Sequence, residues 1–281
     1  MSKKLLVIGF VWPEPKSSAA GSRMMQVLEA FQNYGYHITF ATTTAKTENA
    51  EDLSALGIDE VKIELNCASF DDFISELHPH TVLFDRFMTE EQFGWRVAKH
   101  CPNAIRILDT EDLHCLRKGR QQAFLDAKSF DESYLFSDTA KREIASIYRC
   151  DLSLIISEFE MDLLMNTFKI PKNLLYYLPF MVGISDKELP DFESRNNFIT
   201  VGTFLHEPNY RASLFLKTTI WPLIKQQLPK AELHIYGAYA SQKVLQLHDE
   251  KSRFLIKGFV EDIAAEMQNA RVCLAPLQFG A

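Results

Sequence analysis

The feature that most constrains the fold is a unit that repeats after residue 197: a short apolar run, a glycine and an amphipathic segment. Residues 198–201 are apolar and reach Gly202. From Pro208 onward, apolar side chains recur at helical spacing: Ala212, Phe215, Leu216, Ile220, Leu223 and Ile224. Three more apolar runs follow: 232–237, 254–260 and 271–277. Strands that alternate with helices in this way predict a parallel sheet with helices on both faces.

The glycines of this repeat fall where such a sheet binds ligands. In open parallel sheets, ligands lie beyond the carboxyl ends of the strands, and a glycine lets a ligand approach the backbone closely. A glycine also ends a strand without any ligand, so each one taken alone leaves both interpretations open. The glycines concerned are Gly202, Gly237 and Gly280.

Four segments of this region follow one another in a familiar order and spacing: 198–209, 229–237, 257–262 and 275–281. With them the chain resembles glycosyltransferase family 4 (glycosyl transferases group 1). Its last third resembles the nucleotide-sugar-binding domain of that family's GT-B architecture. The resemblance implies an α/β fold of two Rossmann-like domains and the transfer of a sugar from a nucleotide-sugar donor, with retention of configuration. It also implies donor contacts at Gly202, His206, Asn209, Gly237, Val260 and Gly280.

The end of the sequence departs from the family pattern. There, the last segment continues through a further glycine, a lysine and a helix whose glutamate contacts the donor sugar, whereas this sequence stops at Ala281. The resemblance therefore implies a second domain that is incomplete at its C-terminal end. Two alternatives to a transferase stay open: a protein or inactive fragment that binds sugar nucleotides without turnover, and a GT-B epimerase.

The length of 281 residues suits two domains. We expect an N-terminal, acceptor-side Rossmann-like domain over residues 1–180 and the partial second domain over residues 197–281. Residues 181–196 are polar, contain Pro190 and have no clear period, which is typical of an interdomain linker.

Charge and cysteine content narrow the class of protein. A net charge of −7 argues against a general nucleic-acid binder, which needs cationic contacts to phosphate. Five cysteines without a Cys-x-x-Cys pair argue against a disulfide framework or zinc site and favour the cytoplasm. The apolar run at residues 5–11 is too short for a signal peptide or a membrane span, so we expect membrane contact to be peripheral at most.

The first loop is a candidate anion site. A strand is expected at residues 4–10, and a loop rich in proline and small residues leads to a helix at 22–33, which Ser22 can cap. Small residues before a helix amino end, with a cation in its first turn, are typical of a phosphate cradle. A flexible surface loop explains the same pattern. The family resemblance places this loop against the donor and indicates Ser18, Gly21 and Arg23.

Two strand ends in the first half carry charged side chains. A strand at residues 81–84 leads into Asp85 and Arg86, which we interpret as acceptor-binding residues or, alternatively, as a surface ion pair. Arg117 begins a basic cluster with Lys118 and Arg120, ahead of a helical stretch at 121–148 that holds one or two helices. This cluster can hold a phosphorylated or lipid-diphosphate acceptor, or simply start a solvated helix.

The strand at residues 105–108 delivers the catalytic candidates Glu111 and Asp112. In family 4 this strand end often carries a histidine near the reacting sugar, and the resemblance aligns Glu111 with it, within one residue. Carboxylate and imidazole both accept a proton but differ in charge and resting pKa. GT-B enzymes generally need no metal for the chemistry, so we expect neither metal nor cofactor. The expected partners are a nucleotide-sugar donor and a sugar, lipid-linked or protein acceptor.

Overall fold

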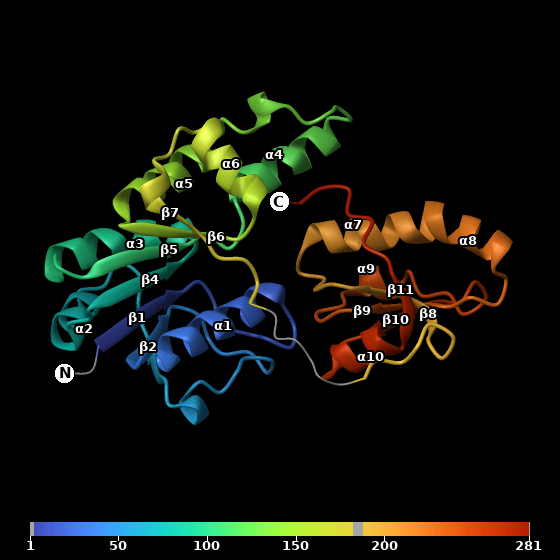
Figure 1. The fold of residues 1–281 in the computed structure, drawn as a ribbon, viewed down its shortest axis with the longest axis horizontal. Coiled ribbons are helices and arrows are strands. Elements are labelled where there is room, and N and C mark those ends of the chain that lie inside the picture. The colour runs from blue at the N-terminus through green and yellow to red at the C-terminus, as the bar shows by residue number, and fades with distance from the viewer. Residues whose placement is uncertain (1–2, 182–187, 281) are drawn as a thin grey trace. The chain divides into compact units, whose positions relative to one another are not determined.

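The computed structural model describes residues 3–181 and 188–280 (Figure 1). The described chain forms two compact units, one of residues 3–15 and 20–181 and the other of residues 16–19 and 188–280. Of the linker expected at 181–196, residues 182–187 lie outside the described residues. Each unit has its own parallel sheet.

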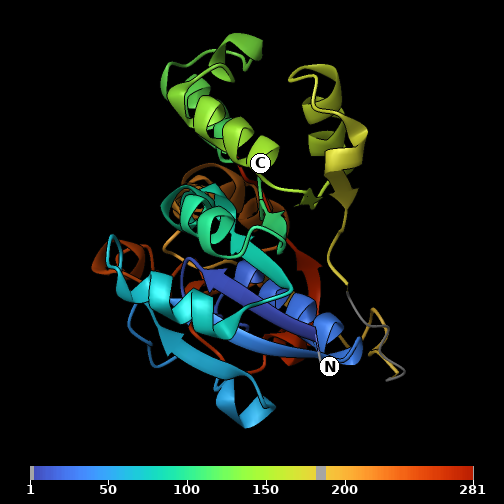
Figure 2. The ribbon, with the colours of Figure 1, turned by 90° about the vertical axis from the view of Figure 1, so that its left-hand side faces the viewer.

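The sheet of the first unit has seven parallel strands: β1 (Lys3–Gly9), β2 (Tyr36–Thr42), β3 (Asp59–Lys62), β4 (Thr81–Asp85), β5 (Ile105–Asp109), β6 (Leu152–Ile155) and β7 (Leu175–Tyr177). Their order is β3-β2-β1-β4-β5-β6-β7 (Figure 2). The direction of the chain across the sheet therefore reverses between β1 and β4. In open α/β sheets, ligands bind beyond the carboxyl ends of the strands at such a reversal.

Helices cover both faces of this sheet: α1 (Ala19–Asn33), α2 (Ser69–Leu77), α3 (Arg86–His100), α4 (His114–Leu125), α5 (Asp138–Arg149) and α6 (Glu158–Asn166), with the 3₁₀ turns η1 (Ser54–Leu56), η2 (Glu132–Tyr134) and η3 (Lys172–Leu174). Leu5 and Val7 of β1 pack with α1, whereas Leu6 and Ile8 belong to the core that α2 to α6 complete. Successive side chains of a strand point to opposite faces, so β1 is apolar throughout because both of its faces are buried.

The second unit has a smaller parallel sheet of β8 (Asn196–Val201), β9 (Leu233–Tyr236), β10 (Phe254–Gly258) and β11 (Ala270–Cys273). Its order is β10-β9-β8-β11, with the reversal between β8 and β11. The helical segments are α7 (Glu207–Phe215), the π-helical turn η4 (Leu216–Ile220), α8 (Trp221–Gln227), α9 (Gln242–Leu245) and α10 (Ile263–Asn269).

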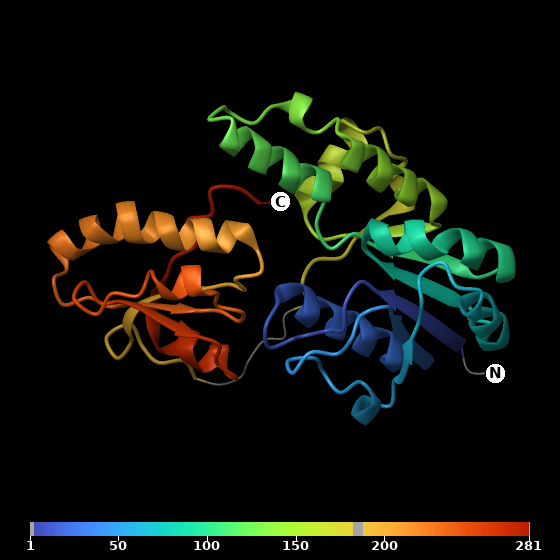
Figure 3. The same ribbon diagram turned by 180° about the vertical axis from the view of Figure 1, so that it is seen from behind.

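The helices of this unit also lie on both faces. The segments α7, η4 and α8 form one long rod along one face, and α10 lies on the other (Figures 1 and 3). Trp221 packs with Leu233 and Phe254 under the rod, while Ile199 and Tyr236 form a separate apolar cluster with Ala270. The predicted α/β fold with two Rossmann-like domains is confirmed, and the second of their parallel sheets is the smaller one.

Candidate functional site

The first unit gathers charged side chains at the reversal between β1 and β4. Asp85, at the end of β4, is the register partner of Asp109, at the end of β5. Asp85 Oδ2 accepts a hydrogen bond of 2.9 Å from the backbone N–H of Phe10, which directly follows β1. The carboxyl ends of three adjacent strands are thereby tied together, with two buried carboxyl groups among them.

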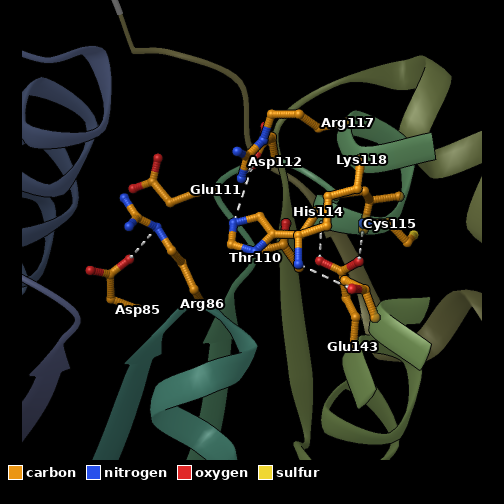
Figure 4. Close-up of polar contacts among 12 residues, drawn as sticks. Asp85, Arg86, Thr110, Glu111, Asp112, His114, Cys115, Arg117, Lys118 and Glu143 are labelled. Carbon is orange, nitrogen blue, oxygen red and sulfur yellow. Dashed lines mark hydrogen bonds and ion pairs between the residues drawn. The ribbon is translucent and has the colours of Figure 1, made fainter. Parts of the chain in front are cut away.

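Two residues beside this edge have left-handed backbone conformations. Arg86 has φ of 70° and Glu111 has φ of 59°. This region is unfavourable for residues other than glycine, and strain of this kind collects at functional sites. In Figure 4 the Arg86 guanidinium lies between the carboxyl groups of Asp85 and Glu111, with its Nε 3.5 Å from Asp85 Oδ1. Two residues with strained backbones thus face each other across adjacent strand ends.

The carboxyl group of Glu111 has a strongly raised pKa. Glu111 is 8% exposed. Burial, followed by the nearby Asp85 and Asp109, raises its pKa to about 9 against the opposing pull of Arg86 and Arg23. At neutral pH the group therefore carries a proton and can donate a hydrogen bond.

Arg23, expected to bind donor phosphate, is buried with 0% exposure. Its Nε and Nη2 lie 3.3 and 3.2 Å from Asp109 Oδ1, and its Nη1 donates to the Leu178 carbonyl at 2.7 Å. Burial raises the pKa of Asp109, and Arg23 opposes that rise. The guanidinium joins α1 to the end of β5 and to the chain after β7. This geometry favours a structural role, and donor binding by Arg23 stays a prediction.

The rest of the first loop packs against the start of α1. A Cβ at Gly21 would lie 2.4 Å from the backbone of Glu14, so only glycine lets the loop fold back this closely. The helix begins at Ala19 rather than at Ser22. Ser22 therefore does not cap it, and its hydroxyl donates to the Pro15 carbonyl at 2.8 Å. Ser18 is half-buried in the loop, and its predicted donor contact stays a prediction.

Asp112 lies between two basic side chains. Arg117 Nε donates to Asp112 Oδ2 at 2.7 Å, and His114 Nε2 lies 3.5 Å from Asp112 Oδ1 (Figure 4). His114 is 6% exposed and its ring meets Phe87 edge-on. Burial and the nearby Arg117 lower the pKa of His114 to about 4, so its imidazole is neutral at physiological pH.

His114 was not among the predicted site residues. A signal for it existed, since the resemblance places a histidine at this strand end and His114 follows Glu111 by three positions. In the structure, Glu111 and His114 both follow the same end of β5.

In the second unit, three predicted donor residues interlock at the ends of β8 and β9: Gly202, Asn209 and Gly237. A Cβ at Gly237 would lie 2.1 Å from the Gly202 carbonyl oxygen, and a Cβ at Gly202 would lie 2.6 Å from the Asn209 side chain. Asn209 Nδ2 also donates to the Thr203 carbonyl at 2.8 Å and so closes the loop between β8 and α7. A small pocket opens here, at the reversal between β8 and β11, with walls that include Gly202, Asn209, Ser213, Tyr236, Ala275 and Leu277.

Three further donor residues were predicted in this unit: His206, Val260 and Gly280. His206 is exposed at the residue before α7, and its carbonyl accepts from the Asn209 N–H at 3.1 Å. Val260 packs against the cluster of Ile199, Tyr236 and Ala270. At Gly280 a Cβ would meet nothing within 4 Å.

We expect Gly237→Ala to destabilise the second unit. The added methyl would collide with a backbone carbonyl, which cannot move aside as a flexible side chain does, and overpacking of this kind costs about 1–3 kcal/mol. Urea unfolding measures the loss. Gly280→Ala is the matched control, because its methyl has open space, and equal stability of the two variants would contradict the interlock.

The described parts of the chain contain no group of three or more histidine, cysteine or acidic side chains that could hold a metal ion. Within the same residues, no helix has the length and apolar character needed to span a membrane.

Residues 195–281, which contain the interlocked trio, match the family of glycosyl transferases group 1. This part of the chain is similar to glycosyl transferases group 1 and is called the group 1 segment below. It includes every donor residue that was predicted after the first loop, from Gly202 to Gly280. The sequence matches none of the curated proteins with which it was compared.

Solved structures resemble both the group 1 segment and the unit before it. Sucrose-phosphate synthase from Thermosynechococcus elongatus has a TM-score of 0.63 at 14% identity, over 99% of this chain and 77% of that one. A mutant of S. aureus TarM in complex with fondaparinux, alpha-GlcNAc-glycerol and UDP has a TM-score of 0.67 at 9% identity, over 97% and 80%. S. aureus MnaA with UDP has a TM-score of 0.58 at 12% identity, over 97% and 74%. At such identities the likeness shows the fold, which is GT-B-like.

Proposed function

We propose that this protein is a glycosyltransferase that moves a sugar from a nucleotide-sugar donor to an acceptor, with retention of configuration. The observation that carries the proposal is the match of residues 195–281 to glycosyl transferases group 1. Within that segment the pocket at the reversal between β8 and β11 is the proposed donor subsite, because open parallel sheets bind ligands there. The TarM and MnaA structures hold UDP, so uridine diphosphate sugars are the first donors to test.

The proposed chemistry in the first unit centres on Glu111. Glycosyl transfer must stabilise a departing diphosphate and an oxocarbenium-like centre. A carboxyl group with a pKa of about 9 can donate a hydrogen bond to an oxygen that gains charge. Asp112, held by Arg117 and His114, contributes negative charge in a fixed position. Asp85, Arg86 and Arg117 are the proposed acceptor contacts.

Calorimetric titration of the purified, monodisperse chain with UDP-, GDP- and ADP-sugars tests the proposal. We expect saturable binding of one nucleotide class, with the free diphosphate competing for the same site. Release of free sugar or its transfer to an added acceptor, followed by chromatography, separates a transferase from a protein that only binds the donor. A folded chain that binds no member of the panel would contradict the donor subsite.

A further inference from the structure

The amino end of α4 is held by two carboxyl groups from different helices. Glu160 Oε1, on α6, accepts a hydrogen bond of 2.8 Å from the Leu113 N–H. Glu143, on α5, accepts from the His114 N–H at 2.9 Å with Oε1 and from the Cys115 N–H at 3.0 Å with Oε2. The first amides of a helix have no partner within it and attract anions. Here the protein itself supplies those anions, so this helix end is not open to a phosphate.

Glu143 and Glu160 are 1% and 2% exposed, which makes their placement costly. A buried carboxyl group loses its hydration and is tolerated only with strong partners. The His114 and Cys115 N–H groups are such partners for Glu143, and in Figure 4 its carboxyl group lies against their backbone. A residue that merely filled this space would be apolar, so the carboxyl group points to a specific task.

That task concerns the strained turn directly before α4. On the strand side, Thr110 donates to the Leu154 carbonyl of β6 through its N–H at 3.3 Å and its hydroxyl at 2.9 Å. On the helix side, the amides of residues 113–115 are held by the two glutamates. Glu111 and Asp112 lie between these fixed points. A left-handed, non-glycine residue persists only where its surroundings over-determine the backbone.

We propose that Glu143 is a positioning residue, which fixes the start of α4 and thereby holds the turn of residues 110–113 and the carboxyl group of Glu111 in place. This inference rests on the proposed function and deepens it. The hydrogen bonds described for Glu143 go to the backbone of α4 and not to Glu111 or Asp112, so Glu143 acts on them through that backbone. Asp112 and the Cys115 thiol are the titratable groups that face it, and burial raises its pKa to about 7.

Hydrogen exchange of Glu143→Gln tests the positioning directly. Glutamine keeps the shape of the side chain, but its amide nitrogen cannot accept a bond, so either His114 or Cys115 loses its partner. We expect exchange of the peptide covering residues 110–117 to accelerate about tenfold or more, with β1 and β4 unchanged. Glu90→Gln is the matched control, because Glu90 is 3% exposed and pairs with Arg149 rather than with α4. Its loss should leave residues 110–117 unaffected.

Turnover supplies the second readout. Glu143→Gln should lower kcat about tenfold or more and leave donor affinity unchanged, whereas Glu90→Gln should retain kcat. Unchanged exchange at residues 110–117, or faster exchange with full kcat, would overturn the proposal. If Glu143→Gln does not fold, Glu143→Asp takes its place, since its shorter carboxylate cannot reach both the His114 and Cys115 amides and should accelerate exchange in the same peptide. If the wild-type chain binds no donor, the proposed function is contradicted. The hydrogen-exchange result does not depend on donor binding, so it still tests whether Glu143 fixes the turn of residues 110–113.

Discussion

Glu111→Gln is expected to stabilise the protein and to slow its turnover at the same time. Burial raises the pKa of Glu111 from 4.5 to about 9 in the folded chain. Between these values the folded protein keeps a proton that the unfolded chain has released. Stability therefore falls as pH rises through this window, by about 1.4 kcal/mol per pH unit for a single group. Glutamine has no proton to lose, so the variant escapes the penalty.

The stability gain should consequently depend on pH. At pH 5 the free energies of unfolding of the two proteins should agree to within about 1 kcal/mol, and at pH 8 the variant should be more stable by about 4–5 kcal/mol. Urea unfolding at both values measures the difference. Glu76→Gln, an exposed carboxyl group on α2, is the control and should change stability at neither pH. A gain that is the same at pH 5 and pH 8 would mean that Glu111 does not hold a proton in the folded state.

The activity of Glu111→Gln should move in the opposite direction. A positioned group that exchanges protons or stabilises charge in the transition state contributes about 10²–10⁴-fold to the rate. We expect kcat to fall about a hundredfold or more, with unchanged affinity for the donor. Stability gained together with activity lost is the signature of a residue strained for function. Wild-type turnover in this variant would remove Glu111 from the site.

The strands were predictable from the sequence because a buried parallel strand is an unbroken apolar run. The run at residues 5–8 is unbroken and fully buried, and it lies in β1, which spans Lys3–Gly9 where a strand was expected at residues 4–10. The start of α4 was not predictable. The expected helix began at residue 121, whereas α4 begins at His114, and the residue before it makes no side-chain cap. Its amides are capped by glutamates 29 and 47 positions away, so no local pattern marks the boundary.

The site was predictable only as far as strand ends reveal it. Asp85, Arg86 and Glu111 follow apolar runs, and the topology brings them together. The strain of Arg86 and Glu111 and the raised pKa of Glu111 depend on neighbours that no spacing shows. Gly202 and Gly237 fall at strand ends as expected. The sequence alone could not show that Gly237 leaves room for the Gly202 carbonyl, or that Gly202 leaves room for the Asn209 side chain.

The role that the sequence predicts for Arg23 differs from the one that its contacts indicate. From the sequence it is a cation in the first turn of a helix behind a small-residue loop, which is typical of phosphate binding. In the structure its partner is Asp109, 86 positions away, and neither side chain has exposed surface. A phosphate-binding role and a structural role for Arg23 predict different effects of substituting it.

Arg23→Met is therefore expected to destabilise the first unit by about 3–5 kcal/mol, because it leaves Asp109 buried without its cation. Methionine fills much of the same volume, so the loss reports on charge rather than on a cavity. Urea unfolding gives the free energy. Arg142→Met is the control, because its pair with Glu91 leaves the arginine side chain 53% exposed, and such pairs contribute about 1 kcal/mol or less.

The double variant Arg23→Met with Asp109→Asn separates the charge from the rest of the side chain. Removing the stranded carboxyl group should recover part of the lost stability, whereas Asp109→Asn with Arg142→Met should show simple additivity. The sequence-based role predicts another outcome: Arg23→Met would retain its stability and lose affinity for the donor diphosphate. Stability loss with partial rescue assigns Arg23 to the support of the β5 end, where it holds Asp109, whose Oδ1 also accepts from the Glu111 N–H at 3.3 Å.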